Sequence, residues 1–354
     1  MKIRKNLFLA YIDALQNRID VLPENIDEQY QVTKQGYEGE KAFAQILESY
    51  GAEWWLYDLQ IKNFNHIQFD FVVITDDAII QFEIKNYTGD YYFDQHKLFR
   101  STGFVSKDLI NQYEVAQEGL KRIVEKYKLK RKVESYVVFI HPTFTLHGDL
   151  RSRMNIILKS EIHKIKDMVL QNFKYEENKW IYHKLKSLHE PFLNTNEIPN
   201  LNIDYKNLKR GVRCTNCRKL IRVDELFNKR KYLKCHHCKK ELNRANIIIQ
   251  SLEELYLLKG APFSVKEAEM WTGVYRSSIK RILYKYFIRS GNRKSTKYGP
   301  IKINYRSRNK KYGPIKKLPV QKREIWTDKN NYRSITSDYP YQQSHYLHKL
   351  NSSY

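Results

Sequence analysis

The chain has 354 residues, and its 63 Lys and Arg outnumber 39 Asp and Glu, which gives a formal net charge of +24. This excess favours an anionic partner such as nucleic acid. No run approaches the roughly eighteen apolar residues of a spanning helix, so a membrane protein is not expected and the cytoplasm is the predicted location. With 42% hydrophobic residues, the chain can bury one sizeable core and form smaller satellites.

Residues 1–30 combine a basic start with an apolar patch, as a weak signal peptide would. Asp13 interrupts the patch, however, and Leu7, Tyr11, Leu15 and Ile19 recur at helical spacing. We therefore predict an amphipathic helical extension that packs on the core of the next domain.

A second helix is predicted to open at residues 36–40, Gly-Tyr-Glu-Gly-Glu. Its apolar stripe consists of Phe43, Ile46, Leu47 and Tyr50. Glu40 borders this stripe, where a surface carboxylate is unusual. Two interpretations follow: the side chain has a partner, or a first-turn acid stabilises the helix dipole.

Two alternating runs, 68–74 and 79–85, predict strands joined by a turn at 75–78. A two- or four-residue loop places Asp70 directly across from Glu83, with Lys85 beside Glu83 on the same face. Opposed carboxylates repel unless a cation lies between them, and Mg²⁺ prefers such oxygen ligands. The alternatives are an ordinary solvated hairpin face, or a three-residue loop that shifts the pairing by one residue.

Downstream, Asp108 is expected to begin an amphipathic helix that runs through Val115, Leu120 and Ile123. Residues 134–140 then predict another strand. The expected order is helix, strand, hairpin, strand, helix and strand, which is consistent with an α/β domain.

These elements resemble the nuclease-related domain, a branch of the PD-(D/E)XK nuclease superfamily, over residues 31–145. The matching residues are Gly39-Glu40, Asp70, Glu83-Ile84-Lys85, Asn86-Tyr87-Thr88-Gly89 and Gln112. The resemblance implies a mixed sheet flanked by helices, and a nuclease that hydrolyses phosphodiester bonds with Mg²⁺ or Mn²⁺.

The resemblance also implies the roles of the site residues. Asp70 and Glu83 would hold the metal, and Lys85 would position or activate the attacking water or stabilise the developing charge. Glu40 would support the metal or its water, and Gln112 would orient water or substrate. DNA is favoured over RNA only by analogy with the superfamily. The competing hypothesis is a nuclease-like scaffold that binds nucleic acid without cutting it.

Residues 146–210 show helical patterning and a loop at 194–200, which predict a helical junction between domains. Beyond it, the cysteines form two CxxC pairs separated by seventeen residues: Cys214, Cys217, Cys235 and Cys238. This spacing predicts a zinc ribbon over residues 211–245 with one structural Zn²⁺. A redox pair is the alternative, although one CxxC would suffice for it. His236 and His237 are expected to contact solvent or nucleic acid.

Residues 246–290 predict a helix-turn-helix-like module. Ser264 and Glu267 form a capping box, and a turn at 272–274 separates the two helices. The expected core is Val265, Ala268, Val274, Ile279 and Ile282. Four cations on the second helix suit a groove or phosphates: Arg276, Lys280, Arg281 and Lys285. A plain helical hairpin on the ribbon is the alternative.

Residues 291–354 are predicted to form a flexible basic tail rich in tyrosine. Thirteen Lys or Arg and no acid lie between residues 289 and 323. A short repeat, Lys-Tyr-Gly-Pro-Ile-Lys, spans 297–302 and 311–316, so Lys297, Lys302, Lys311 and Lys316 are candidate phosphate contacts. A tail that only aids solubility is the alternative, and residues 327–354 are expected to be disordered.

Overall fold

The computed structural model describes residue 3 and residues 5–62, 66–104, 108–170, 172–190, 201, 203–227, 231–292 and 295–300. Within these residues, no helix is long and apolar enough to cross a membrane. Residues 301–354 lie outside the described part, and with them the predicted contacts Lys302, Lys311 and Lys316.

A five-stranded mixed sheet organises the first half of the chain, in the order β1-β2-β3-β7-β9. Its strands are β1 (Trp55–Ile61), β2 (Ile67–Ile74), β3 (Ala78–Lys85), β7 (Lys132–Phe139) and β9 (Ile156–Leu158). Strands β1, β2 and β3 pair antiparallel, whereas β7 and β9 run parallel to their neighbours. The predicted α/β class with a mixed sheet is confirmed. Strand β9 lies beyond residue 145, so the sheet continues into the segment predicted as a junction.

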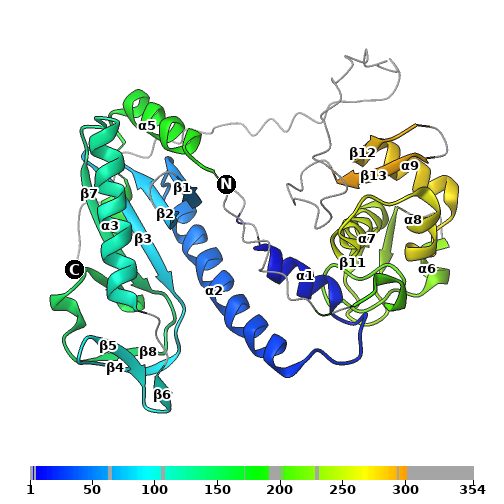
Figure 1. The fold of residues 1–354 in the computed structure, drawn as a ribbon, viewed down its shortest axis with the longest axis horizontal. Coiled ribbons are helices and arrows are strands. Elements are labelled where there is room, and N and C mark those ends of the chain that lie inside the picture. Colours follow the sequence, from blue (N-terminus) through cyan, green and yellow to red (C-terminus); the bar gives the residue numbers. More distant parts are fainter. Residues whose placement is uncertain are drawn as a thin grey trace, which may run out of the picture. The chain divides into compact units, whose positions relative to one another are not determined.

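Helices cover both faces of this sheet (Figure 1). Residues of α2 (Glu24–Ser49) and α4 (Lys164–Val169) pack on one face. Residues of α3 (Leu109–Lys126) and α5 (Tyr175–Ser187) pack on the other. Leu120 and Ile123 are buried as predicted, but Val115 is 49% exposed and is not part of the buried stripe of α3.

Helix α2 begins at Glu24, not at residues 36–40 as predicted. The chain before Gly36 carries no strong apolar stripe, so its helical state could not be recognised from periodicity alone. A smaller sheet, β6-β5-β4-β8, lies at Gly103–Phe104, Lys97–Arg100, Gly89–Asp94 and Phe144–His147. Short 3₁₀ helices lie at Leu150–Ser152, Lys159–Glu161 and Tyr205–Asn207.

The second half builds a separate apolar core. Its elements are α6 (Val223–Phe227), β10 (Tyr232–Lys234), β11 (Glu241–Asn243), α7 (Arg244–Lys259), α8 (Val265–Thr272), α9 (Arg276–Tyr286), β12 (Phe287–Ser290) and β13 (Lys297–Pro300). Cys214 and Cys235 of the predicted ribbon are buried in the same cluster as Leu252 of α7 and Ile279 of α9. The ribbon and the helices therefore share one core.

Helix α1 (Leu7–Leu15) belongs to this second core, which corrects the prediction that it packs on the nuclease-like core. Polar contacts explain why α1 packs on the second core. Asp13 is buried, pairs with Lys5 and accepts a hydrogen bond from Tyr30 Oη at 2.7 Å. Arg18, just after α1, donates to the carbonyls of Lys209 and Gly211 and to Glu254. The partners of Arg18 lie on the C-terminal module, and periodicity cannot reveal them.

Strand β13 corrects a second prediction. The flexible tail was expected to begin at residue 291, but Lys297–Pro300 pairs with Phe287–Ser290 in an antiparallel hairpin. Tyr298 also forms a β-bridge with Phe263, at the entrance to α8. The hairpin is thus anchored to the helical module, and the start of the first Lys-Tyr-Gly-Pro-Ile-Lys copy is ordered structure.

Candidate functional site

The β2–β3 hairpin has the predicted register. Ile74 lies opposite Ile79, Val72 opposite Gln81 and Phe71 opposite Phe82. The Thr75 amide donates to the carbonyl of Ala78 at 2.9 Å and closes the turn. The paired region of β2 and β3 ends at Phe71 and Phe82. The next residues, Asp70 on β2 and Glu83 on β3, therefore lie together at the open end of the hairpin.

The alternation of side chains between the two faces of β2 is interrupted at Asp70. Ile67 and Phe69 lie in the same apolar cluster as Val72, although strict alternation would put them on opposite faces. On the neighbouring strand, Asp58 has a left-handed backbone, with φ of 51°, at the point that faces Asp70 in the register. Such paired irregularities re-aim side chains and are common beside active sites.

Three predicted site residues form a hydrogen-bonded chain. Lys85 Nζ donates to Glu83 Oε1 at 2.8 Å and to Gln112 Oε1 at 3.3 Å. Gln112 lies in the first turn of α3, so that helix delivers it to the end of β3. Burial alone would lower the pKa of Lys85, but the carboxylates of Glu83 and Asp70 outweigh it and raise the pKa. Lys85 is therefore a firmly protonated cation in this arrangement.

Asp70 is oriented by the backbone of β3. Its Oδ2 accepts a hydrogen bond from the Ile84 amide at 2.9 Å. Burial, together with the negative charges of Glu83 and Glu40, raises the pKa of Asp70 well above its usual value. Carboxylates crowded in this way are stabilised by a cation, which is the electrostatic condition for a metal site.

Glu40 has the partner that its place beside the apolar stripe suggested. Tyr57 Oη of β1 donates to Glu40 Oε2 at 2.6 Å. Burial raises the pKa of Glu40, and the charges of Asp58 and Glu83 raise it further, while the Tyr57 hydrogen bond opposes them. Tyr57 was not among the residues predicted for the site. The signal available in the sequence was its spacing of two residues from Trp55, which places both side chains on the face of β1 that α2 covers.

Gly39 sets the distance between α2 and the end of β3. A Cβ atom at this position would lie 2.6 Å from Asn86 Cβ. Two reciprocal hydrogen bonds hold the same contact, from Gln35 Nε2 to the Asn86 carbonyl at 2.6 Å and from Asn86 Nδ2 to the Gln35 carbonyl at 2.8 Å. The close approach places Glu40, the next residue, at the carboxylate group.

These residues fit a hard divalent cation in chemistry, since Asp70, Glu83 and Glu40 supply only oxygen ligands. The oxygens are not gathered as tightly as the cysteine sulfurs, which form the one group of three or more His, Cys, Asp or Glu among the described residues that lies close enough to hold an ion. Glu83 is engaged by Lys85 instead. Binding a metal through Glu83 would require its carboxylate to exchange the ammonium for the ion.

The four cysteines meet as the spacing predicts. Their Sγ atoms lie within 4.8 Å of one another, and the Cys214–Cys238 and Cys217–Cys235 separations are both 3.7 Å. A tetrahedron with Zn–S bonds of about 2.3 Å has edges of about 3.8 Å, so the sulfurs fit Zn²⁺.

The two cysteine knuckles share one backbone shape. The Cys214 amide donates to the Lys219 carbonyl, and the Cys235 amide donates to the Lys240 carbonyl. The residue after each second cysteine, Arg218 or Lys239, is left-handed, with φ of 62° and 60°.

The two histidines of the second knuckle differ. His236 is half-buried, with Nδ1 3.4 Å from Glu225 Oε1, whereas His237 is exposed. His237 therefore has the solvent contact that was predicted for both, and His236 keeps part of it, with 24% of its side chain exposed.

The predicted basic helix is exposed. Arg276, Lys280, Arg281 and Lys285 all lie on the solvent side of α9, whereas Ile279 and Ile282 are buried as predicted. The Ser264–Glu267 capping box is present at the start of α8. Lys297 is exposed too, but its ammonium lies 3.4 Å from Glu267 Oε2, so it is partly neutralised.

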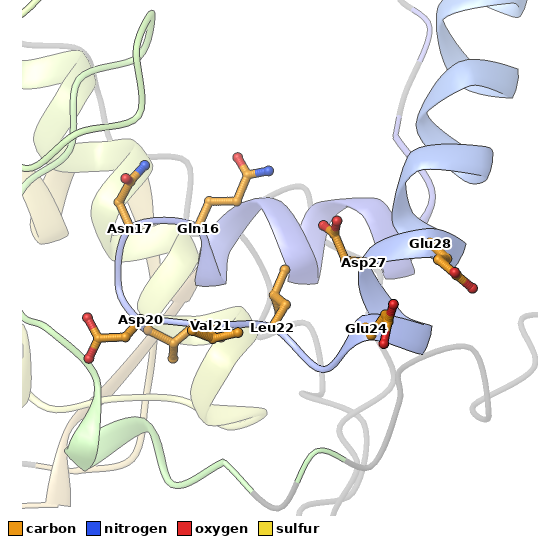
Figure 2. Close-up of a pocket in the computed structure, with 9 residues that line it drawn as sticks. Gln16, Asn17, Asp20, Val21, Leu22, Glu24, Asp27 and Glu28 are labelled. Carbon is orange, nitrogen blue, oxygen red and sulfur yellow. The ribbon is translucent and has the colours of Figure 1, made fainter.

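The cavity drawn in Figure 2, of about 680 Å³, shares no residue with the carboxylate group. It lies between the end of α1 and the start of α2, and Asp20, Glu24, Asp27 and Glu28 line it. Asp20 pairs with Lys209. An acidic lining repels a phosphodiester, so this cavity does not extend the candidate site.

The comparisons with known proteins bear on the first half of the chain. Residues 35–140 match the family model of the nuclease-related domain. The searches among curated proteins and among solved structures gave no match. The matched segment contains Glu40, Asp70, Glu83, Lys85 and Gln112. Residues 35–140 of this chain therefore form a nuclease-related domain.

Proposed function

We propose that this protein is a metal-dependent nuclease that hydrolyses phosphodiester bonds in nucleic acid, with DNA as the substrate. The Glu83–Lys85–Gln112 chain beside Asp70 is the observation that carries the proposal. It combines oxygen ligands, a fixed cation and a neutral hydrogen-bonding group at the open end of one hairpin.

The proposed roles follow from these contacts. Asp70 and Glu83 would hold Mg²⁺ or Mn²⁺, which when bound neutralises phosphate charge and lowers the pKa of a coordinated water. Lys85 would position the attacking water and stabilise the charge that develops on the phosphate. Gln112 can turn its amide toward water or substrate. Tyr57 positions Glu40 from the neighbouring strand.

The C-terminal module would bind the substrate. The cysteine cluster would hold structural Zn²⁺, and the cationic face of α9 would contact phosphates. This division explains why one chain carries both a carboxylate site and a strongly basic module.

The test is a cleavage assay of the full chain on plasmid, linear duplex, single-stranded DNA and RNA, with Mg²⁺ or Mn²⁺. Wild type should cut DNA, and Glu83→Gln should lower the rate by at least about 100-fold, because charge-stabilising groups contribute on that order. The matched control is Glu118→Gln, an exposed acid on α3 that should cut normally. Elemental analysis should find one zinc per chain.

The competing function is a non-cutting protein that binds nucleic acid on a nuclease-like scaffold. The basic C-terminal module supports binding in either case. If wild type and Glu83→Gln were equally inactive on every substrate while both bound nucleic acid, the nuclease proposal would fail and the scaffold would stand.

A further inference from the structure

Helices α7, α8 and α9 and the β12–β13 hairpin form one packed body. Gly273, left-handed with φ of 69°, ends α8 and allows the tight turn into α9. After α9 the chain enters β12 directly. The Phe263 and Phe287 rings pack edge to face at 5.9 Å, and the Phe263–Tyr298 bridge holds β13. The hairpin is thus fixed next to α9 and moves with it.

One face of α9 is cationic and open to solvent. Arg276, Lys280 and Tyr284 are spaced at i, i+4 and i+8, so they form a stripe along the helix, and Arg281 and Lys285 widen it. The opposite face, Ile279, Ile282 and Leu283, is buried. α9 contains no acid.

Among the residues that the structure describes, little negative charge offsets this face. Arg276 has a distant partner in Glu269, at 3.9 Å. Burial lowers the pKa of Arg244, and the positive charge of the nearby Arg281 lowers it further. The two arginines therefore repel each other. A surface that brings cations together without acids between them is stabilised when an anion binds.

We propose that α9 is a recognition helix for double-stranded DNA, inserted in the major groove. This inference rests on the proposed action on nucleic acid and names its substrate as duplex DNA. The dimensions agree: eleven residues make a helix about 16 Å long, and the major groove of B-DNA, about 12 Å wide, admits a helix.

The shape of the α9 surface suits duplex DNA better than duplex RNA or single strands. The major groove of A-form RNA is deep and narrow, so side chains on a helix cannot enter it. Single strands are commonly bound in grooves where bases stack on aromatic rings. The cationic stripe of α9 lies on the convex outside of a helix. Its exposed Tyr284 lies one turn after Lys280 and Arg281, which suit contacts with phosphates.

The experiment measures binding without cleavage. The full chain carrying Glu83→Gln, with no divalent ion added, is titrated into fluorescent duplex DNA, its single strand and duplex RNA of the same sequence. Binding is followed by anisotropy over a range of salt concentrations. The test variant adds Lys280→Ala and Arg281→Ala. The matched control adds Lys121→Ala and Arg122→Ala, an adjacent exposed pair on α3 that carries the same charge. Zinc content and circular dichroism establish that each variant is folded.

We expect duplex DNA to bind at least tenfold tighter than either other ligand. The α9 variant should lose about tenfold or more in duplex affinity, and the slope of log K against log salt should fall by about 2, since each lost phosphate contact contributes about 0.9. The control should change neither.

Equal binding of duplex and single strand, equal binding of duplex RNA, or an α9 variant that binds like the control would each overturn the inference. None of these outcomes touches cleavage by the carboxylate site. Conversely, if the chain bound duplex DNA through α9 but never cut it, only the nuclease proposal would be overturned.

Discussion

Two glycines in α2 provide a matched test of how the helix positions the site. Gly36 and Gly39 are interior residues of the same helix, so replacing either by Ala should gain the same helix propensity, about 0.5–1 kcal/mol. A Cβ at Gly36 would meet nothing within 4 Å. Gly36→Ala should therefore stabilise the protein and leave cleavage unchanged.

Gly39→Ala should do the opposite. Its Cβ would lie 2.6 Å from Asn86 Cβ and 3.1 Å from Asn86 Cγ, about 1 Å inside the usual carbon–carbon separation. The nearest atom is bonded to the backbone and cannot rotate away, so α2 must shift. Overpacking of this kind costs about 1–3 kcal/mol. Helix propensity cancels between the variants, so their free energies of unfolding should differ by about that amount.

The shift should also reach the site, because Glu40 follows Gly39 directly. A displacement of about 1 Å in a positioning group can lower a rate by about 100-fold. Denaturant unfolding and the cleavage assay measure the two effects. If Gly39→Ala were as stable and as active as Gly36→Ala, the proposed role of the Gly39–Asn86 contact would be refuted.

Other predictions concern the C-terminal module. Cys214→Ser should release zinc and remove hydrogen-exchange protection from α1 and α7 as well as the ribbon, since they share one core; protected helices would contradict this. Removing residues 301–354 should keep the zinc but lower the salt slope of DNA binding, and an unchanged slope would leave that segment without a binding role. Glu254→Gln should destabilise the module by about 3–5 kcal/mol, because it leaves Arg18 and Arg213 buried without a counter-charge.

The same variant has a pH signature. The pKa of Glu254 in the folded protein is lowered, because the arginine charges and hydrogen bonds outweigh burial. A lowered folded pKa contributes stability above the unfolded value, near 4.5, that is lost as pH falls through the folded value. The stability difference between wild type and Glu254→Gln should therefore be full at pH 7 and shrink below about pH 4.5. A constant difference down to pH 2 would contradict the ion-pair explanation.

Local features could be predicted from the sequence because residues close to one another in the chain determine them. The alternation in β2 and β3 and the turn at 75–78 predicted the pairing of Ile74 with Ile79, with a three-residue loop that shifts the pairing by one residue as the alternative. The CxxC spacing predicted the sulfur cluster, since each knuckle is a local turn. The Ser264–Glu267 capping box marked the start of α8 for the same reason.

Long-range contacts decided the rest. The apolar stripe of α1 predicted a helix, but its partner was set by Arg18 reaching Glu254, 236 residues away. The Tyr57 hydrogen bond to Glu40 and the pairing of β13 with β12 likewise join segments whose sequences carry no mark of each other. Periodicity reports which face of an element is buried, and only the folded chain determines what covers that face.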